Sequence, residues 1–96
     1  MNYNEKKRRE AEERGMRNYV RADKIKIRAA YDGNYLAVAN NGFGKYYIAD
    51  DDINKSELRI RVGKKFPGSF VLIGTVDEII SNRDTSAKLE EFLYDG

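Results

Sequence analysis

The chain has 96 residues, of which 41% are hydrophobic and 35% are charged, and its formal net charge is +2. This length and composition fit one small domain with a modest core and not a disordered chain. The sequence contains no cysteine and no histidine. It therefore lacks disulfides, thiolate chemistry, Cys-based zinc sites and the commonest acid–base group near neutral pH. We expect no enzyme, no catalytic residue, no cofactor and no metal site.

The charge is unevenly distributed along the chain. Residues 1–28 carry ten Lys or Arg against five acids, a net charge of +5, whereas residues 29–96 carry eight against eleven, a net charge of −3. A dipolar chain of this kind indicates an oriented polyanionic partner. The longest apolar run, Phe70–Ile73, is too short to span a membrane, and no apolar stretch follows the charged N-terminus. We expect no membrane partner and a cytoplasmic location.

Residues 1–22 are expected to form a basic helical arm. Glu, Lys, Arg and Ala dominate this stretch, and Asn4 is a candidate N-cap. Gly15 interrupts it, and its apolar content is thin. A helix that is polar on nearly every side either projects into solvent or is covered by a binding partner. We therefore expect only its second half, from Met16 to Val20, to dock on the domain formed by residues 23–96.

The middle of the chain predicts an antiparallel meander. About five strands are expected, at residues 24–31, 34–39, 43–49, 57–62 and 70–73. Four of them are predicted by alternation of apolar and polar residues or by flanking turn signals, and the last by its apolar run. Asp32-Gly33 is a strong hairpin signal between the first two strands, and Pro67-Gly68 fits a type II turn.

Helices are expected after the last strand. Thr75 with Glu78 three residues later is a capping box that opens a helix over residues 76–81. A second helical segment is expected over residues 86–94. Both should pack on one face of the sheet, which gives an α+β fold.

The acidic segment between two predicted strands resembles the start of a calcium-binding loop. Asp50, Asp52 and Asn54 fall at alternate positions, as in an EF-hand. Lys55 and Arg61, however, stand where that loop needs a glycine and a bidentate glutamate. We therefore interpret residues 50–56 as a polar turn.

Strand parity groups five cations into a candidate site. If the strands over residues 24–31 and 57–62 keep their apolar side to the core, their cations project from the opposite face of one sheet. These cations are Lys24, Lys26, Arg28, Arg59 and Arg61. Tyr47 would add aromatic surface, with Tyr35 and Phe43. Cations interleaved with aromatic rings suit a nucleic-acid strand, although charged residues also simply keep an exposed sheet face soluble.

Two basic groups outside these strands complete the candidate site. Lys64 and Lys65 lie at a turn that follows Arg59 and Arg61, and Arg8 and Arg9 belong to the basic cluster of the arm. The alternative for the arm is a solvent-exposed helix whose basic residues form ion pairs with neighbouring glutamates.

These patterns indicate a non-enzymatic binding protein. We expect it to bind nucleic acid, as RNA or single-stranded DNA, through the sheet face and the arm. The alternative is a phage-type inhibitor of a host nucleic-acid-acting enzyme, of the anti-restriction or anti-CRISPR class, which would act by protein–protein binding. Exposed Tyr beside Arg is equally typical of a protein hot spot. A homodimer through an edge strand is a further option.

Overall fold

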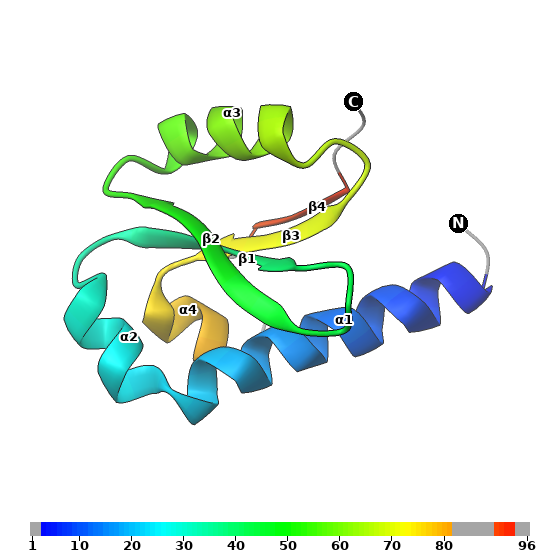
Figure 1. The fold of residues 1–96 in the computed structure, drawn as a ribbon, viewed down its shortest axis with the longest axis horizontal. Coiled ribbons are helices and arrows are strands. Elements are labelled where there is room, and N and C mark those ends of the chain that lie inside the picture. Colours follow the sequence, from blue (N-terminus) through cyan, green and yellow to red (C-terminus); the bar gives the residue numbers. More distant parts are fainter. Residues whose placement is uncertain (1–2, 82–89, 94–96) are drawn as a thin grey trace.

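A computed structural model describes residues 3–81 and 90–93, and it has the expected α+β class (Figure 1). The elements in chain order are α1 (Tyr3–Ala22), α2 (Lys24–Ala30), β1 (Tyr35–Asn40), β2 (Tyr46–Asp52), α3 (Lys55–Lys65), β3 (Phe70–Gly74), α4 (Val76–Ile80) and β4 (Glu90–Leu93). The described helices include none that is long and apolar enough to cross a bilayer.

Within the described residues the sheet has four strands in the order β2-β1-β3-β4, and each neighbouring pair is antiparallel. Strands β1 and β2 form a hairpin, after which the chain crosses over through α3 and returns on the other side of β1. Strands β2 and β3 therefore run in the same direction on either side of β1. The expected five-stranded meander is wrong in both strand number and strand order.

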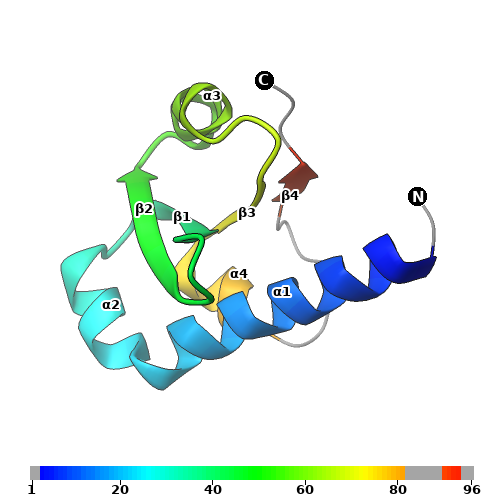
Figure 2. The same ribbon diagram turned by 45° about the vertical axis from the view of Figure 1, so that its right-hand side comes forward.

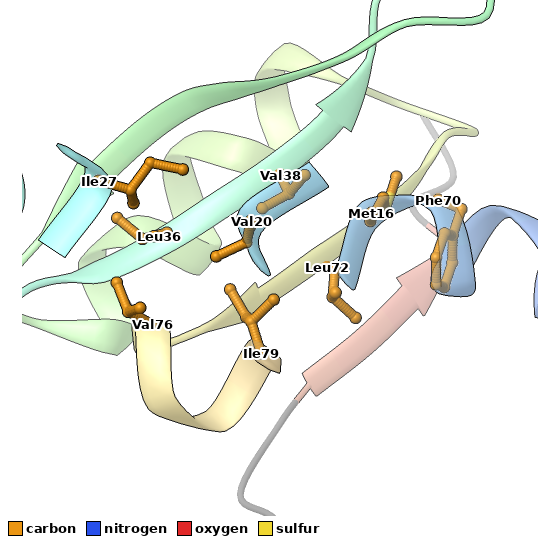
Figure 3. Close-up of a cluster of buried hydrophobic side chains, with 9 residues drawn as sticks. All are labelled: Met16, Val20, Ile27, Leu36, Val38, Phe70, Leu72, Val76 and Ile79. Atoms are coloured by element: carbon orange, nitrogen blue, oxygen red, sulfur yellow. The ribbon is translucent and has the colours of Figure 1, made fainter. Parts of the chain in front are cut away.

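Helices cover both faces of the sheet (Figures 1 and 2). Helices α1, α2 and α4 pack on one face, and α3 packs on the other. The first core, drawn in Figure 3, contains Met16, Val20, Ile27, Leu36, Val38, Phe70, Leu72, Val76 and Ile79. The second core contains Ala37, Ala39, Leu58, Val62, Val71 and Ile73. Because β1 and β3 contribute to both cores, their side chains are buried on the two faces alike.

Residues 24–30 and 55–65 are helices where the sequence predicted strands. Leu58 and Val62 are fully buried while Ile60 between them is 55% exposed, and Ile27 is buried while Ile25 is 78% exposed. Positions four apart share a face in a strand and also in a helix, so the buried pair is compatible with both periods. In α3 the choice is set by the N-cap, because the Asn54 side chain accepts a hydrogen bond from the Glu57 amide at 3.1 Å.

Other local predictions had mixed outcomes. The capping box is confirmed, since Thr75 and Glu78 exchange hydrogen bonds at 3.0 and 3.2 Å. The turn at Pro67-Gly68 is also confirmed: Gly68 has a φ of 74°, and the Ser69 amide donates to the Phe66 carbonyl at 3.2 Å. Asp32-Gly33 is not a hairpin turn, because it connects α2 to β1.

The predicted C-terminal helix and acidic turn also differ from the structure. In the segment 86–94, residues 90–93 form strand β4 and not a helix, and the remainder lies outside the described residues. The polar turn expected over residues 50–56 is shorter, because its first three residues extend β2 and its last two begin α3.

The second half of α1 is fixed to α4 by two arginines. The Arg17 guanidinium donates to the Ile79 carbonyl at 3.0 Å, and the Arg21 guanidinium donates to the Ile80 carbonyl at 3.0 Å. These carbonyls lie at the C-terminal end of α4, where the backbone lacks intrahelical donors and carries partial negative charge. Met16 and Val20 are fully buried beside them, as expected for the docked half of the arm.

Candidate functional site

The five cations that were expected to share one sheet face lie on opposite sides of the molecule. Lys24, Lys26 and Arg28 belong to α2, and Arg59 and Arg61 belong to α3. These two helices cover opposite faces of the sheet, as Figure 2 shows. The prediction that the five cations share one exposed sheet face is therefore wrong. It assumed that residues 24–31 and 57–62 form strands, whereas the chain forms helices there.

Arg28 and Arg61 make ion pairs within the protein. Arg28 on α2 pairs with Asp77 at the start of α4. Arg61 donates to Asp50 at 3.0 Å and to Asp52 at 2.8 Å, which ties α3 to the end of β2. The hydrogen bond from Arg61 holds the pKa of the Asp50 carboxyl group below its ordinary value. The pKa of Asp52 is lowered first by the Asn54 backbone amide, which donates to its carboxylate at 2.8 Å, and then by Arg61. Arg61 is therefore a brace between two elements. Lys24, Lys26 and Arg59 are exposed.

Arg8 and Arg9 line a groove formed by three segments of the described chain. Its volume is about 580 Å³, and it lies between the first half of α1, the β1–β2 loop and the turn from α3 to β3. In Figure 1 these three segments all lie on the right-hand side of the molecule. The lining residues are Glu5, Arg8, Arg9, Glu12, Ala39, Asn40, Gly42, Gly44, Phe66, Gly68, Ser69 and Phe70.

The groove exists because one face of α1 changes from apolar to charged side chains towards the N-terminus. The face that buries Met16 and Val20 continues towards the N-terminus through Glu12, Arg9 and Glu5, at spacings of three and four residues. Where α1 passes the end of the sheet, this face therefore offers charged side chains instead of apolar ones. Met16 is the last residue of α1, going towards the N-terminus, that packs into the core, and the groove lies next to the residues that precede it.

Two aromatic rings of the groove are each approached by a cation. The Arg9 guanidinium lies 5.8 Å from the centroid of the Phe70 ring, and Lys65 Nζ lies 5.7 Å from the centroid of the Phe66 ring. Cations at these separations are attracted by the ring faces. The arm thus places positive charge on one wall of the groove, while Lys65 at the end of α3 lies against the Phe66 ring of another wall without lining the groove itself.

Lys26 and Tyr47 meet at a second, smaller cavity. It has a volume of about 340 Å³ and lies between α1, α2 and β2, where Tyr19 and Tyr31 also line it. Burial, together with neighbouring Tyr31 and Asp23, raises the pKa of the Tyr19 hydroxyl, so it stays protonated and uncharged at neutral pH. Three tyrosines from separate elements and one lysine thus surround a shallow opening beside an edge strand.

Comparison with protein-family models, with curated proteins and with solved structures finds no match. The functional argument therefore rests on the chemistry of these surfaces. Of the ten predicted site residues, Arg8 and Arg9 line the larger groove. Lys65 does not line it but lies against the ring of Phe66, which does, and Lys64 directly precedes Lys65 in the chain. Sequence reasoning missed Phe66 and Phe70 as its aromatic walls. The available signal was the charged continuation of the Met16 and Val20 face of α1.

Proposed function

We propose that this chain is a non-enzymatic nucleic-acid-binding protein whose groove holds a strand of RNA or single-stranded DNA. The observation that carries this proposal is the meeting of Arg8 and Arg9 with Phe66 and Phe70 around one opening of about 580 Å³. Arginine side chains bind phosphate oxygens through a planar fork of donors, and aromatic rings offer apolar surface to bases. Of the two rings, the half-buried Phe66 would offer this surface, whereas Phe70 is 8% exposed and belongs to the first core.

The glutamates of the groove affect how tightly it binds. Glu5 and Glu12 stand on the same helix face as Arg8 and Arg9 and lower the net positive charge there. Binding should therefore depend only moderately on salt. With Arg8, Arg9 and Lys65 each neutralising one phosphate of a single strand, the slope of log affinity against log salt is expected to be about −2.

The test is a titration of labelled single-stranded RNA, single-stranded DNA and duplex DNA at low and moderate salt, followed by fluorescence polarisation. The double variant Arg8→Glu with Arg9→Glu is expected to weaken binding of single strands more than about tenfold. Its matched control is Lys24→Glu with Lys26→Glu, which makes the same change of net charge on α2. The control should bind nearly as the unmodified chain does.

Two outcomes would overturn the proposal. If the unmodified protein binds none of the three nucleic acids at low salt, the groove has another role. If the Lys24 and Lys26 control loses as much affinity as the Arg8 and Arg9 variant, attraction by overall charge explains the binding, and the groove does not.

The cavity of Tyr19, Tyr31 and Tyr47 favours a second candidate function. Tyrosine is enriched at the centres of protein–protein interfaces, and this cavity lies beside β2, an edge strand of the sheet. A phage-type inhibitor that binds a host nucleic-acid-acting enzyme would use such a surface. Failure to bind nucleic acid, combined with loss of enzyme inhibition in a Tyr47→Lys variant, would support this function over the first.

A further inference from the structure

Phe43 is the most exposed of the large hydrophobic side chains that the structure describes. It is 88% exposed and lies in the β1–β2 loop between Gly42 and Gly44, two residues that line the groove. A phenylalanine that is buried stabilises a protein by about 1.5–3 kcal/mol relative to an exposed one. In the protein alone this ring makes no such contribution, although it stands at the rim of the groove.

Hydrogen bonds within the loop stabilise its backbone conformation. The Asn40 side chain accepts a hydrogen bond from the Gly42 amide at 2.8 Å, and the Asn41 side chain accepts one from the Phe43 amide at 2.7 Å. The Asn41 amide also donates to the Lys45 carbonyl at 2.9 Å. Gly42 and Gly44 have positive φ values of 90° and 82°. A Cβ atom at either position would meet no other atom within 4 Å, so the backbone conformation is the reason for glycine there.

This rigidity matters for binding. A ring presented by a braced loop loses little conformational freedom when a ligand covers it. A flexible loop would lose more, and the same contact would then contribute less affinity. The β1–β2 loop therefore has the properties of a preformed contact surface.

We propose that Phe43 stacks on an unpaired base of the strand held in the groove and thereby makes the site selective for single strands over duplexes. This inference rests on the proposed function. Arg8 and Arg9 on the α1 wall would hold the phosphates, while Phe43 on the facing loop takes a base. Bases in a duplex already stack on their neighbours and pair across the helix, so they offer no free face to the ring.

Phe43→Trp provides a direct test, because the chain contains no tryptophan. The single indole at position 43 should be quenched by oligo(dA) or oligo(U) in a saturable manner, and a fully paired DNA hairpin should leave its fluorescence unchanged. The control is Ile25→Trp on α2, where the native side chain is 78% exposed and lies away from the groove. Its fluorescence should not respond to either strand.

Removal of the ring gives the second measurement. Phe43→Ala should weaken binding of single strands about 5- to 140-fold, the range expected for one base–aromatic stack. Phe43→Tyr should retain the affinity. Because the side chain is exposed, the melting temperature of both variants should equal that of the unmodified chain.

The outcomes separate this inference from the proposed function. If the unmodified chain binds single strands with salt dependence but Phe43→Ala binds equally well and the indole at position 43 is not quenched, stacking by Phe43 is wrong and the groove proposal stands. Equal affinity for hairpin duplex and single strand would also overturn the stated selectivity. Absence of any binding by the unmodified chain would overturn both proposals.

Discussion

Gly15 lies in the middle of α1, where glycine costs about 1 kcal/mol relative to alanine. A Cβ atom at this position would lie 2.6 Å from Cε2, 2.7 Å from Oη and 2.9 Å from Cζ of Tyr46 on β2. Ordinary contacts between carbon atoms are about 3.5–4.0 Å, so the ring would have to move by about 1 Å. Tyr46 is half-buried and packs against the first core, and forced movements of this kind cost about 1–3 kcal/mol. We expect Gly15→Ala to lower the free energy of unfolding by up to about 2 kcal/mol.

A second background isolates the contact between the helix and the ring. Tyr46→Leu removes the ring atoms that meet the added methyl group, so Gly15→Ala in that background should raise the free energy of unfolding by about 1 kcal/mol. Urea unfolding followed by far-ultraviolet circular dichroism gives all four corners of the double-mutant cycle, with an expected coupling of about 1–3 kcal/mol. If Gly15→Ala changes stability by the same amount in both backgrounds, the close approach of α1 to Tyr46 does not explain the glycine.

Two further predictions concern arginines that brace helices. Arg61 lowers the pKa of Asp50 in the folded state, and the Asn54 amide followed by Arg61 lowers that of Asp52. The stability that the two carboxylates contribute is therefore present above the unfolded value of about 4 and is lost as the pH falls through their folded pKa. Arg61→Ala should therefore lower the melting temperature at neutral pH and make it fall less steeply as the pH decreases. Thermal unfolding at a series of pH values from neutral to acidic measures both effects. If the melting temperature falls with pH as steeply as in the unmodified chain, the prediction is wrong. Arg17→Met should lower the free energy of unfolding by about 1–3 kcal/mol, since it leaves carbonyls of α4 without their donor. Arg14→Met, at an exposed position of α1, should change it by less than about 0.5 kcal/mol.

The sequence correctly predicted those elements in which the capping residues and the hydrophobic periodicity indicate the same type of secondary structure. The charged helix of the arm, the capping box before α4 and the apolar strand β3 were each recognised from residues within a few positions. Helices α2 and α3 were missed because Ile25-Lys-Ile27 and Leu58-Arg-Ile60 alternate as strands do. Only the tertiary structure decides which isoleucines are buried: Ile25 is exposed and Ile27 is buried in α2, and Ile60 is exposed between the buried Leu58 and Val62 in α3.

The candidate site was predicted in part, and for a related reason. Arg8 and Arg9 were identified from a cluster of like charges, which needs no knowledge of the fold. The grouping of Lys24 and Lys26 with cations of α3 depended on strand parity and failed with it. Phe66 and Phe70 approach Arg8 and Arg9 only because the chain crosses over through α3 and returns beside β1. No local pattern reports such a crossover.

The arm is already helical from Tyr3 onwards, so it does not need to order when it meets a ligand. Its second half is fixed to α4 and the first core, and its first half therefore extends past the sheet as one wall of the groove. The β1–β2 loop on the other side is equally braced by its asparagines. Since both walls are preformed and the glutamates limit the net charge, aromatic contacts should supply a larger share of the affinity than phosphates do. A shallow salt dependence together with a large effect of Phe43→Ala is the combination that this architecture requires, whereas a steep salt dependence with no effect of Phe43 would indicate binding by charge alone.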